Sequence, residues 1–283
     1  MTTQESRINE LLTATDEWPV DNAVAAVRDS SGSWTVHGDT DKVYALASVT
    51  KLMSAHAALL AIEEGVFEGG LDEPLGPPGA TVRHLLSHAS GVGFADRTPE
   101  KEPGERRIYS SAGFDIIADA IRDETGMQFS EYLSEATFAP LGMDSSRLVG
   151  SAGHAVESSA EDVMRFLDEI LEPTLLHPDT VDEALTVQFP GLDGVVPGYG
   201  MQKPADWGLG FQIYSNAQSR QGLWFGEAMP NDVSGHFGQS GTFAWIHRPS
   251  GRAGVVLTDQ PFGGWAKPLW ADWNDEMWKV LAD

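Results

Sequence analysis

Apolar and polar residues alternate in five short segments near the two ends of the chain, and this alternation predicts β-strands. The predicted strands cover residues 23–27, 33–37, 207–214, 242–247 and 253–258. A turn signal, Arg248-Pro249-Ser250-Gly251, separates the last two of them. Because the strands lie at both ends of the chain, we expect them to pair in one antiparallel sheet.

A helical spacing of apolar residues predicts the remaining elements. The predicted helices cover residues 5–14, 50–65, 82–88, 112–124, 130–136, 160–171 and 266–281. The sequence therefore predicts an α+β fold in which N- and C-terminal helices flank the sheet. Residues 1–70 plus 206–283 form the expected sheet domain, and residues 71–205 form a mainly helical insertion. An active site is expected in the cleft between the two parts.

The last predicted helix is rich in tryptophan. Trp270, Trp273 and Trp278 lie within it, and Trp265 directly precedes it. Large aromatic side chains at helical spacing are typical of core packing. We therefore interpret these four residues as core residues and not as a ligand cage.

Composition narrows the function classes. The chain of 283 residues is 41% hydrophobic, enough for a packed core, and it has no cysteine, which excludes disulfides, thiolate metal sites and a cysteine nucleophile. Acidic residues outnumber basic ones by 42 to 18, for a formal net charge of −24. Such a surface repels phosphate backbones and anionic lipids, so we expect no nucleic-acid or membrane partner.

The N-terminal residues lack the basic and apolar regions of a secretory signal, and no stretch reaches the length of a transmembrane helix. A cytoplasmic location is therefore the expectation. This expectation bears on substrate, because cell-wall precursors are processed outside the membrane.

The first candidate catalytic motif is Ser48-Val49-Thr50-Lys51, at the start of a predicted helix. The unpaired N–H groups and positive dipole of a helix N-terminus favour an oxyanion there. Lys51 lies one turn beyond Ser48 on the same face, and apolar neighbours would favour the neutral amine that can accept the serine proton. Taken alone, the pattern equally describes an N-cap serine followed by a surface lysine.

Two further segments carry candidate chemistry. Tyr109-Ser110-Ser111 lies between a Pro-Gly turn and a predicted helix, where a tyrosine hydroxyl can face a cleft. His236-Phe237-Gly238 reads as an edge strand, in which the glycine permits close approach to the backbone. The alternatives are a buried tyrosine with a satisfied hydroxyl and a glycine-rich strand with a solvated histidine.

The three motifs together, in this order, resemble those of the serine β-lactamase and penicillin-binding-protein superfamily. The resemblance is greatest to its class C-like branch, which includes D-Ala-D-Ala carboxypeptidases and family VIII esterases. Four connecting segments are similar as well: LLSHASG at residues 85–91, PGERRIYSSAGFD, PLGM at residues 140–143 and WGLGF at residues 207–211. The similarity extends from about residue 20 to residue 260.

The resemblance implies roles for individual residues. Ser48 would be the acylated nucleophile, and Lys51 would share its proton. Tyr109 would act as general base and acid, with the first proton acceptor left open between Lys51 and Tyr109. His236 stands where many relatives have lysine and would contact the substrate. The N–H groups of Ser48 and Gln239 would form the oxyanion hole.

Ser111 is a departure from this pattern, because relatives have asparagine at that position. Ser111 and Gly238 are the expected substrate-binding residues. Serine has a shorter reach and fewer hydrogen-bonding groups than asparagine. The change favours ester cleavage over recognition of a β-lactam or a peptide.

No metal or cofactor is expected. The sequence contains no H-E-x-x-H, no phosphate-binding loop, no dinucleotide fingerprint and no G-x-S-x-G elbow. The histidines outside the third motif show no metal-ligand spacing, and His88 is expected to form a local hydrogen bond.

Three functional hypotheses follow. The first is a serine hydrolase that forms an acyl-enzyme at Ser48 on small esters or amides, as the expected cytoplasmic location and Ser111 favour. The second is a β-lactamase or a D-Ala-D-Ala carboxypeptidase, which the three motifs also permit. The third is a binding protein that kept the fold without catalysis, against which the intact Ser48, Lys51, Tyr109 and His236 argue.

Overall fold

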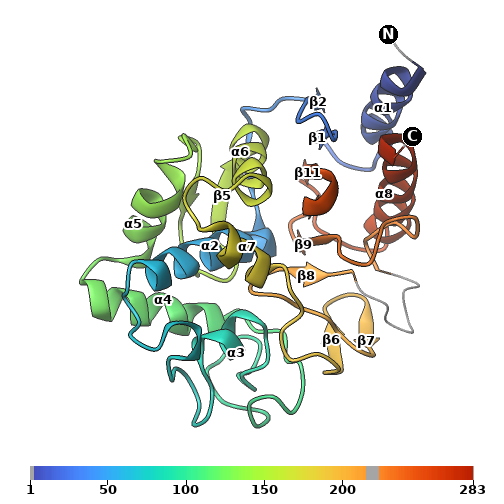
Figure 1. The fold of residues 1–283 in the computed structure, drawn as a ribbon. Coiled ribbons are helices and arrows are strands. Elements are labelled where there is room, and N and C mark those ends of the chain that lie inside the picture. The colour runs from blue at the N-terminus through green and yellow to red at the C-terminus, as the bar shows by residue number, and fades with distance from the viewer. Residues whose placement is uncertain (1–2, 215–222, 283) are drawn as a thin grey trace.

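A six-stranded antiparallel sheet organises the chain, of which the computed structural model describes residues 3–214 and 223–282 (Figure 1). Its strands are, in order across the sheet, β2 (Trp34–His37), β1 (Ala23–Arg28), β11 (Arg252–Thr258), β10 (Thr242–His247), β9 (Ser234–Gly238) and β8 (Gln212–Ile213). In the pairing of β1 with β11, Ala23 lies opposite Thr258 and Arg28 lies opposite Ala253. The two ends of the chain thus meet in the middle of the sheet, and the predicted α+β fold is confirmed.

Side chains of the central strands alternate between two buried cores. On β10, Phe243 and Trp245 pack in one core, whereas Ala244 and Ile246 pack in the other. Helices α1 (Thr3–Thr13) and α8 (Ala266–Ala282) cover the first face, and α2 (Thr50–Glu63) and α6 (Ala160–Leu171) cover the second (Figure 1). Because strand side chains point alternately to opposite faces, helices on both faces bury both sets.

The tryptophans of the last helix lie in the first of these cores. Trp270, Trp273 and Trp278 are buried, and Trp265 packs against them while partly exposed. The interpretation of these residues as core packing is confirmed. None of the helices in residues 3–214 and 223–282 is both long enough and apolar enough to cross a membrane.

The middle of the chain is mainly helical, with short strands between the helices. Its helices are α3 (Val82–Leu86), α4 (Ala112–Thr125), α5 (Phe129–Leu133), the π-helical turn η4 (Ser134–Phe138), α6 and α7 (Pro178–Ala184). Along the whole of residues 3–214 and 223–282, the 3₁₀ turns are η1 (Ala14–Glu17), η2 (Ala47–Val49), η3 (Gly70–Asp72) and η5 (Arg248–Ser250). Strands β3 (Val43–Ala45), β5 (Val156–Ser159) and β4 (Arg147–Leu148) form one small sheet, and β6 (Gly194–Val196) and β7 (Gly200–Gln202) form another.

The strand predicted over residues 207–214 is wrong in extent. Only Gln212 and Ile213 form a strand, β8, and Trp207 makes an isolated bridge to Gln212. The chain turns between them, with the N–H of Gly208 donating to the Phe211 carbonyl at 2.9 Å. Gly210 has a φ of +88° and packs so closely on Ala55 of α2 that a Cβ would clash there. Contact with α2 therefore decides this turn, and the alternation of side chains could not reveal it.

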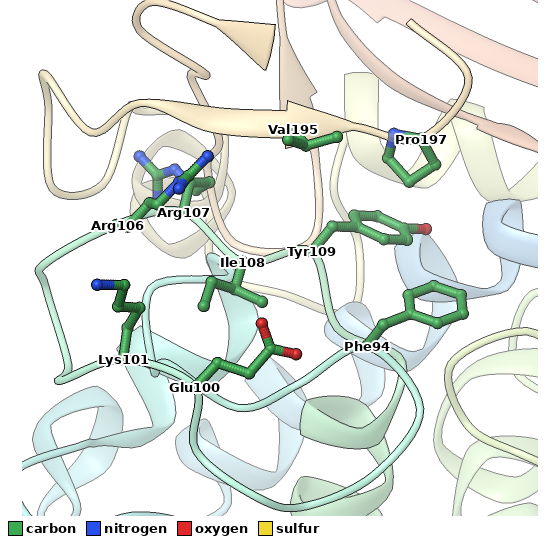
Figure 2. Close-up of a pocket in the computed structure, with 9 residues that line it drawn as sticks. All are labelled: Phe94, Glu100, Lys101, Arg106, Arg107, Ile108, Tyr109, Val195 and Pro197. Carbon is green, nitrogen blue, oxygen red and sulfur yellow. The ribbon is translucent and has the colours of Figure 1, made fainter. Parts of the chain in front are cut away.

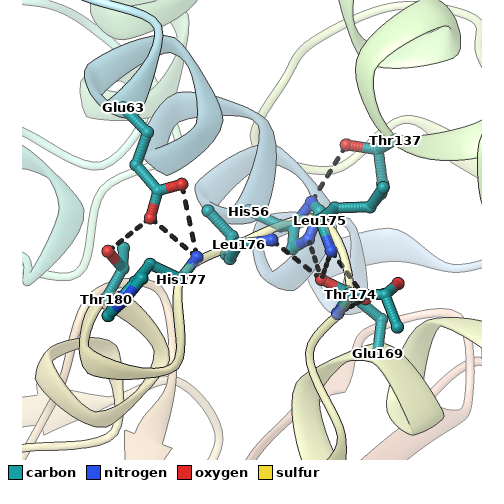
Figure 3. A network of polar contacts seen from close by, with 9 residues as sticks. All are labelled: His56, Glu63, Thr137, Glu169, Thr174, Leu175, Leu176, His177 and Thr180. Atoms are coloured by element: carbon teal, nitrogen blue, oxygen red, sulfur yellow. Dashed lines mark hydrogen bonds and ion pairs between the residues drawn. The ribbon is translucent and has the colours of Figure 1, made fainter.

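A buried polar network joins α2 to the end of α6 (Figure 3). The Glu169 carboxylate, which is fully buried, accepts hydrogen bonds from the N–H groups of Thr174, Leu175 and Leu176 and lies 3.4 Å from His56 Nε2. Burial alone would raise the pKa of Glu169, but the hydrogen bonds from His56, Thr174 and Leu176 lower it to about 2. The ionised carboxylate thus closes the turn that follows α6.

Candidate active site

Ser48 lies in the 3₁₀ turn η2, directly before α2. The backbone on its N-terminal side is held from two directions: the Leu46 N–H donates to the Val156 carbonyl at 2.9 Å, and the Leu46 carbonyl accepts from Thr242 Oγ1 at 2.9 Å. Ala47 has a φ of 45°, a conformation that non-glycine residues rarely adopt. These contacts fix a tight turn that presents Ser48 at the end of the helix.

Gly238 explains how the sheet can approach this turn so closely. A Cβ at Gly238 would collide with the Leu46 carbonyl oxygen and Thr242 Oγ1, and would lie 3.1 Å from the Ala47 Cβ. Strand β9 therefore passes directly against the turn that carries Ser48. The sequence suggested close approach of a ligand at Gly238, whereas the structure shows close approach of the Leu46–Ala47 backbone.

Lys51 is fully buried on the first turn of α2, and its side-chain nitrogen lies among three oxygen atoms. Its Nζ lies 3.3 Å from Ser48 Oγ, 3.0 Å from Ser111 Oγ and 2.7 Å from the Gly153 carbonyl oxygen. The Gly153 carbonyl can only accept, so one N–H of the amine donates a hydrogen bond to it. If Ser111 Oγ accepts a hydrogen bond from the second N–H of a neutral amine, the lone pair of that amine is directed at Ser48.

The same burial changes the proton affinity of Lys51. Removal from water disfavours the ammonium form, and this lowers the pKa of Lys51 to about 7, although the charge of Asp115 acts in the opposite direction. No carboxylate among the described residues pairs directly with the amine. Near neutral pH, a substantial fraction of the molecules therefore carries a neutral Lys51.

Tyr109 and His236 form a second polar pair at the site. The Tyr109 hydroxyl lies 3.3 Å from His236 Nε2, and His236 Nδ1 lies 2.6 Å from the Phe237 carbonyl oxygen. Because a carbonyl only accepts, Nδ1 carries the proton and Nε2 accepts from the tyrosine. Burial lowers the pKa of His236 to about 3 and raises the pKa of Tyr109, with the Ser48 hydroxyl opposing the latter shift. Both side chains are therefore neutral at pH 7.

A cavity of about 130 Å³ opens at Ser48. Of the residues expected from the sequence, Ser48, Tyr109, His236 and Gln239 line it. Lys51 and Ser111 lie behind Ser48, in contact with each other. The rest of the cavity wall was not anticipated as site residues and is mainly apolar: Phe94, Val196, Pro197, Trp207, Gln212 and Phe237. Trp207 and Gln212 belonged to the strand predicted over residues 207–214 and Phe237 to the third motif, whereas Phe94, Val196 and Pro197 lay in segments without any sequence signal.

His88 supports the tyrosine from behind. Its ring lies 4.6 Å from the rings of both Tyr109 and Trp207, and its Nδ1 accepts the Ser110 N–H at 3.1 Å. The local hydrogen bond expected from the sequence was wrong, because the Ser110 N–H that this nitrogen accepts is 22 positions away in the chain. A fully buried histidine thus holds the backbone next to Tyr109 and packs against its ring.

Asp115 orders a loop at the site, although no sequence motif indicated a role for it. Its carboxylate accepts from Ser151 Oγ at 2.8 Å and from the Ala152 N–H at 3.0 Å, which fixes the loop that ends in Gly153. The carbonyl of Gly153 then binds Lys51. Because the acceptor is a backbone oxygen, which every residue type has, the sequence could not predict that position 153 binds Lys51. Across the described ranges, no group of three or more acidic or histidine side chains is arranged to hold a metal ion.

Comparisons with known proteins agree with this geometry. The family model described as Beta-lactamase matches residues 14–274. A solved beta-lactamase from Mycobacterium bovis is 45% identical, with a TM-score of 0.91, over 96% of this chain and 99% of that one.

Two curated relatives match parts of the chain. Penicillin-binding protein 4* of Bacillus subtilis is 27% identical over 55% of this chain and 41% of its own length. The D-alanyl-D-alanine-carboxypeptidase/endopeptidase AmpH of Escherichia coli is 28% identical over 38% of this chain and 37% of its own length. The match thus spans about two fifths of each of these curated relatives.

Proposed function

The chain belongs to the Beta-lactamase family, and from this premise we propose that it is a serine hydrolase that forms an acyl-enzyme at Ser48 on small esters or amides. The observation that carries the proposal is the contact between Lys51 and Ser48. A buried amine with a pKa of about 7 lies 3.3 Å from the serine oxygen. Ser111 and the Gly153 carbonyl accept hydrogen bonds from the same nitrogen. This arrangement suits removal of the serine proton at neutral pH.

Acylation then begins at Ser48. Its Oγ attacks the substrate carbonyl carbon while its proton passes to neutral Lys51. We assign this first transfer to Lys51 rather than Tyr109, because burial raises the pKa of the tyrosine and its hydroxyl is directed at His236. The N–H groups of Ser48 and Gln239 stabilise the oxyanion, and the start of α2 adds its dipole.

Tyr109 completes the reaction. Its neutral hydroxyl can donate a proton to the leaving group, and the proton that Lys51 received from Ser48 then restores the tyrosine. The Lys51 nitrogen lies over the Tyr109 ring, 4.6 Å from its centre, so a water molecule has to carry this proton to the hydroxyl. His236 Nε2 holds the hydroxyl in place between these steps. The acyl-enzyme is released when water attacks it with the same groups acting in reverse.

The ester preference rests on Ser111 and on the cavity. Ser111 contacts Lys51 and does not line the cavity, so it offers no amide group to a peptide or β-lactam carbonyl. The apolar wall formed by Phe94, Val196 and Trp207 suits a short acyl chain.

A second candidate is a β-lactamase or a D-Ala-D-Ala carboxypeptidase. The 45% identity to a protein described as a beta-lactamase favours the first, and the carboxypeptidase among the relatives favours the second. Stable labelling of Ser48 by a fluorescent penicillin, blocked in Ser48→Ala, would support this candidate over the esterase.

The deciding experiment follows release of p-nitrophenol from p-nitrophenyl butyrate by the wild type and Ser48→Ala. Ser134→Ala, an exposed serine on the π-helical turn, is the matched control. We expect turnover by the wild type and the control, a loss of at least about a thousandfold in Ser48→Ala, and a butyryl adduct on the wild type by mass spectrometry. Equal turnover by Ser48→Ala would refute the proposal.

A further inference from the structure

A groove of about 360 Å³ continues outward from the catalytic cavity (Figure 2). The two share Phe94, Tyr109 and Pro197 as a common boundary. A substrate bound at Ser48 can therefore extend past the Tyr109 ring into this outer groove.

The outer groove changes character along its length. Near the catalytic cavity its walls are apolar, with Phe94 55% exposed and Val195 49% exposed although both are large hydrophobic side chains. At the end remote from the Tyr109 hydroxyl, Figure 2 shows Lys101 and Arg106 together. An apolar passage thus leads to a cationic end.

Arg106 is available to bind an anion. Within residues 3–214 and 223–282, its only polar side-chain contact is with Met201 Sδ at 3.6 Å, and no carboxylate there pairs with it. Lys101, in contrast, pairs with Glu105 at 2.8 Å. An adjoining hollow of about 480 Å³ shares Lys101 and Arg106 and adds Lys203, together with the acidic residues Glu105 and Asp193. Although the chain has a net charge of −24, Arg106 thus presents a guanidinium that no carboxylate of the described residues pairs with at the end of the groove.

The walls of the outer groove are held in place before any ligand binds. The buried Arg107 guanidinium donates to the carbonyls of Ser87, Ala205 and Gln188 at 2.7 to 2.8 Å. The Arg107 N–H also donates to the Asp193 carbonyl at 2.9 Å. These bonds tie the segment that carries Arg106 and Tyr109 to the loop that carries Val195.

We propose that the outer groove binds the part of the substrate remote from the scissile bond, and that this part is an apolar chain ending in a carboxylate, which Arg106 recognises. The inference rests on the proposed function of Ser48. Two residues, Arg107 and Ile108, lie between Arg106 and Tyr109, so the Cα atoms of the pair are at most about 10 Å apart, a distance that a chain of several methylene groups can span. Glu100 also faces the groove and disfavours anions, so it has the opposite effect to Arg106.

The test compares esters that differ only in the terminal charge. On the acyl side, p-nitrophenyl monoesters of adipic and suberic acid are paired with p-nitrophenyl hexanoate and octanoate. On the leaving-group side, 4-acetoxyphenylacetate is paired with its neutral amide. The measured quantity is the ratio of kcat/KM for the anionic and neutral members, in the wild type, Arg106→Gln, Glu100→Gln and Arg147→Gln. Arg147, with a side chain 71% exposed and paired with Glu157, lies outside the groove and is the matched control.

In at least one of the two series, we expect Arg106→Gln to lower this ratio about tenfold, because the variant loses a charge-assisted hydrogen bond to the carboxylate. Glu100→Gln should raise the ratio, because it removes a negative charge that faces the groove. High salt should reduce the ratio in the wild type. If the neutral esters are hydrolysed but Arg106→Gln and Arg147→Gln give the same ratio in both series, the inference is wrong while the proposed function stands. If the wild type cleaves no ester, the proposed function fails and this inference fails with it.

Discussion

The Tyr109 hydroxyl donates to His236 Nε2 across 3.3 Å, while the other ring nitrogen of His236 is bound to the Phe237 carbonyl. This pairing determines the tautomer of the histidine. It also keeps the tyrosine protonated and pointed into the cavity, as a proton donor must be.

Replacing His236 should therefore impair catalysis through Tyr109. We expect His236→Phe to lower kcat about 10- to 100-fold, because the buried hydroxyl loses its acceptor. His236→Gln, whose amide oxygen can accept the same bond, should recover part of the loss. Nitrogen NMR should find His236 neutral and protonated on Nδ1 from pH 5 to 8, because burial lowers its pKa to about 3. A titration near pH 6.5 would contradict this assignment.

Activity should depend on the protonation of Lys51. Since only the neutral amine can accept the serine proton and burial lowers the pKa of Lys51 to about 7, kcat/KM should rise with pH up to about 7 and level off above it. Lys51→Arg, which keeps a permanent charge, should be inactive throughout the range. A flat profile in the wild type between about pH 5.5 and 8.5 would argue against Lys51 as the base.

Ser111 should also affect the pKa of Lys51. Its hydroxyl accepts from Lys51 at 3.0 Å, and this contact stabilises the ammonium form more than the neutral form. Ser111→Ala should therefore shift the kinetic pKa of Lys51 below its value of about 7 and lower kcat/KM about tenfold. The pH profile distinguishes this role from a structural one, because a variant that only loosens the site would keep the wild-type pKa.

Gly238 should be intolerant of a side chain. Because a Cβ there would collide with the Leu46 carbonyl and Thr242 Oγ1, Gly238→Ala should lower the free energy of unfolding by about 1 to 3 kcal/mol. The Ser48 turn should also move, with loss of activity beyond the loss of stability. Gly264→Ala is the control, since open space surrounds that position. Equal melting temperatures for the two variants would show that β9 can shift without cost.

Glu169 should contribute to stability in a pH-dependent way. Its pKa is about 2 in the folded chain and near the ordinary 4.5 when unfolded, so the stabilisation is complete above pH 4.5 and is lost as pH falls towards 2. Glu169→Gln should destabilise the fold by roughly 3 kcal/mol at pH 7 and by much less near pH 2. Urea unfolding of the wild type, this variant and the exposed control Glu135→Gln measures the difference. A loss that is equal at both pH values would refute the ionised role.

Local sequence determined much of the fold. The bounds of α6 and β10 agree with their predicted ranges, because each element has a clear helical or alternating period along the chain. The order of the Ser48, Tyr109 and His236 motifs along the chain also indicates the family. These features depend on residues that are close together in the chain.

Tertiary structure decided how those residues work. The Gly153 carbonyl that binds Lys51 is 102 positions away in the chain and has no side-chain signature. The turn at Gly210 depends on contact with α2, and the outer groove forms only where the Arg106 segment meets the loop of Val195. The pKa of Lys51 likewise follows from complete burial by several segments. Residue types near one another in the chain can therefore identify the reacting groups, but desolvation and long-range backbone contacts set their proton affinities and the shape of the site.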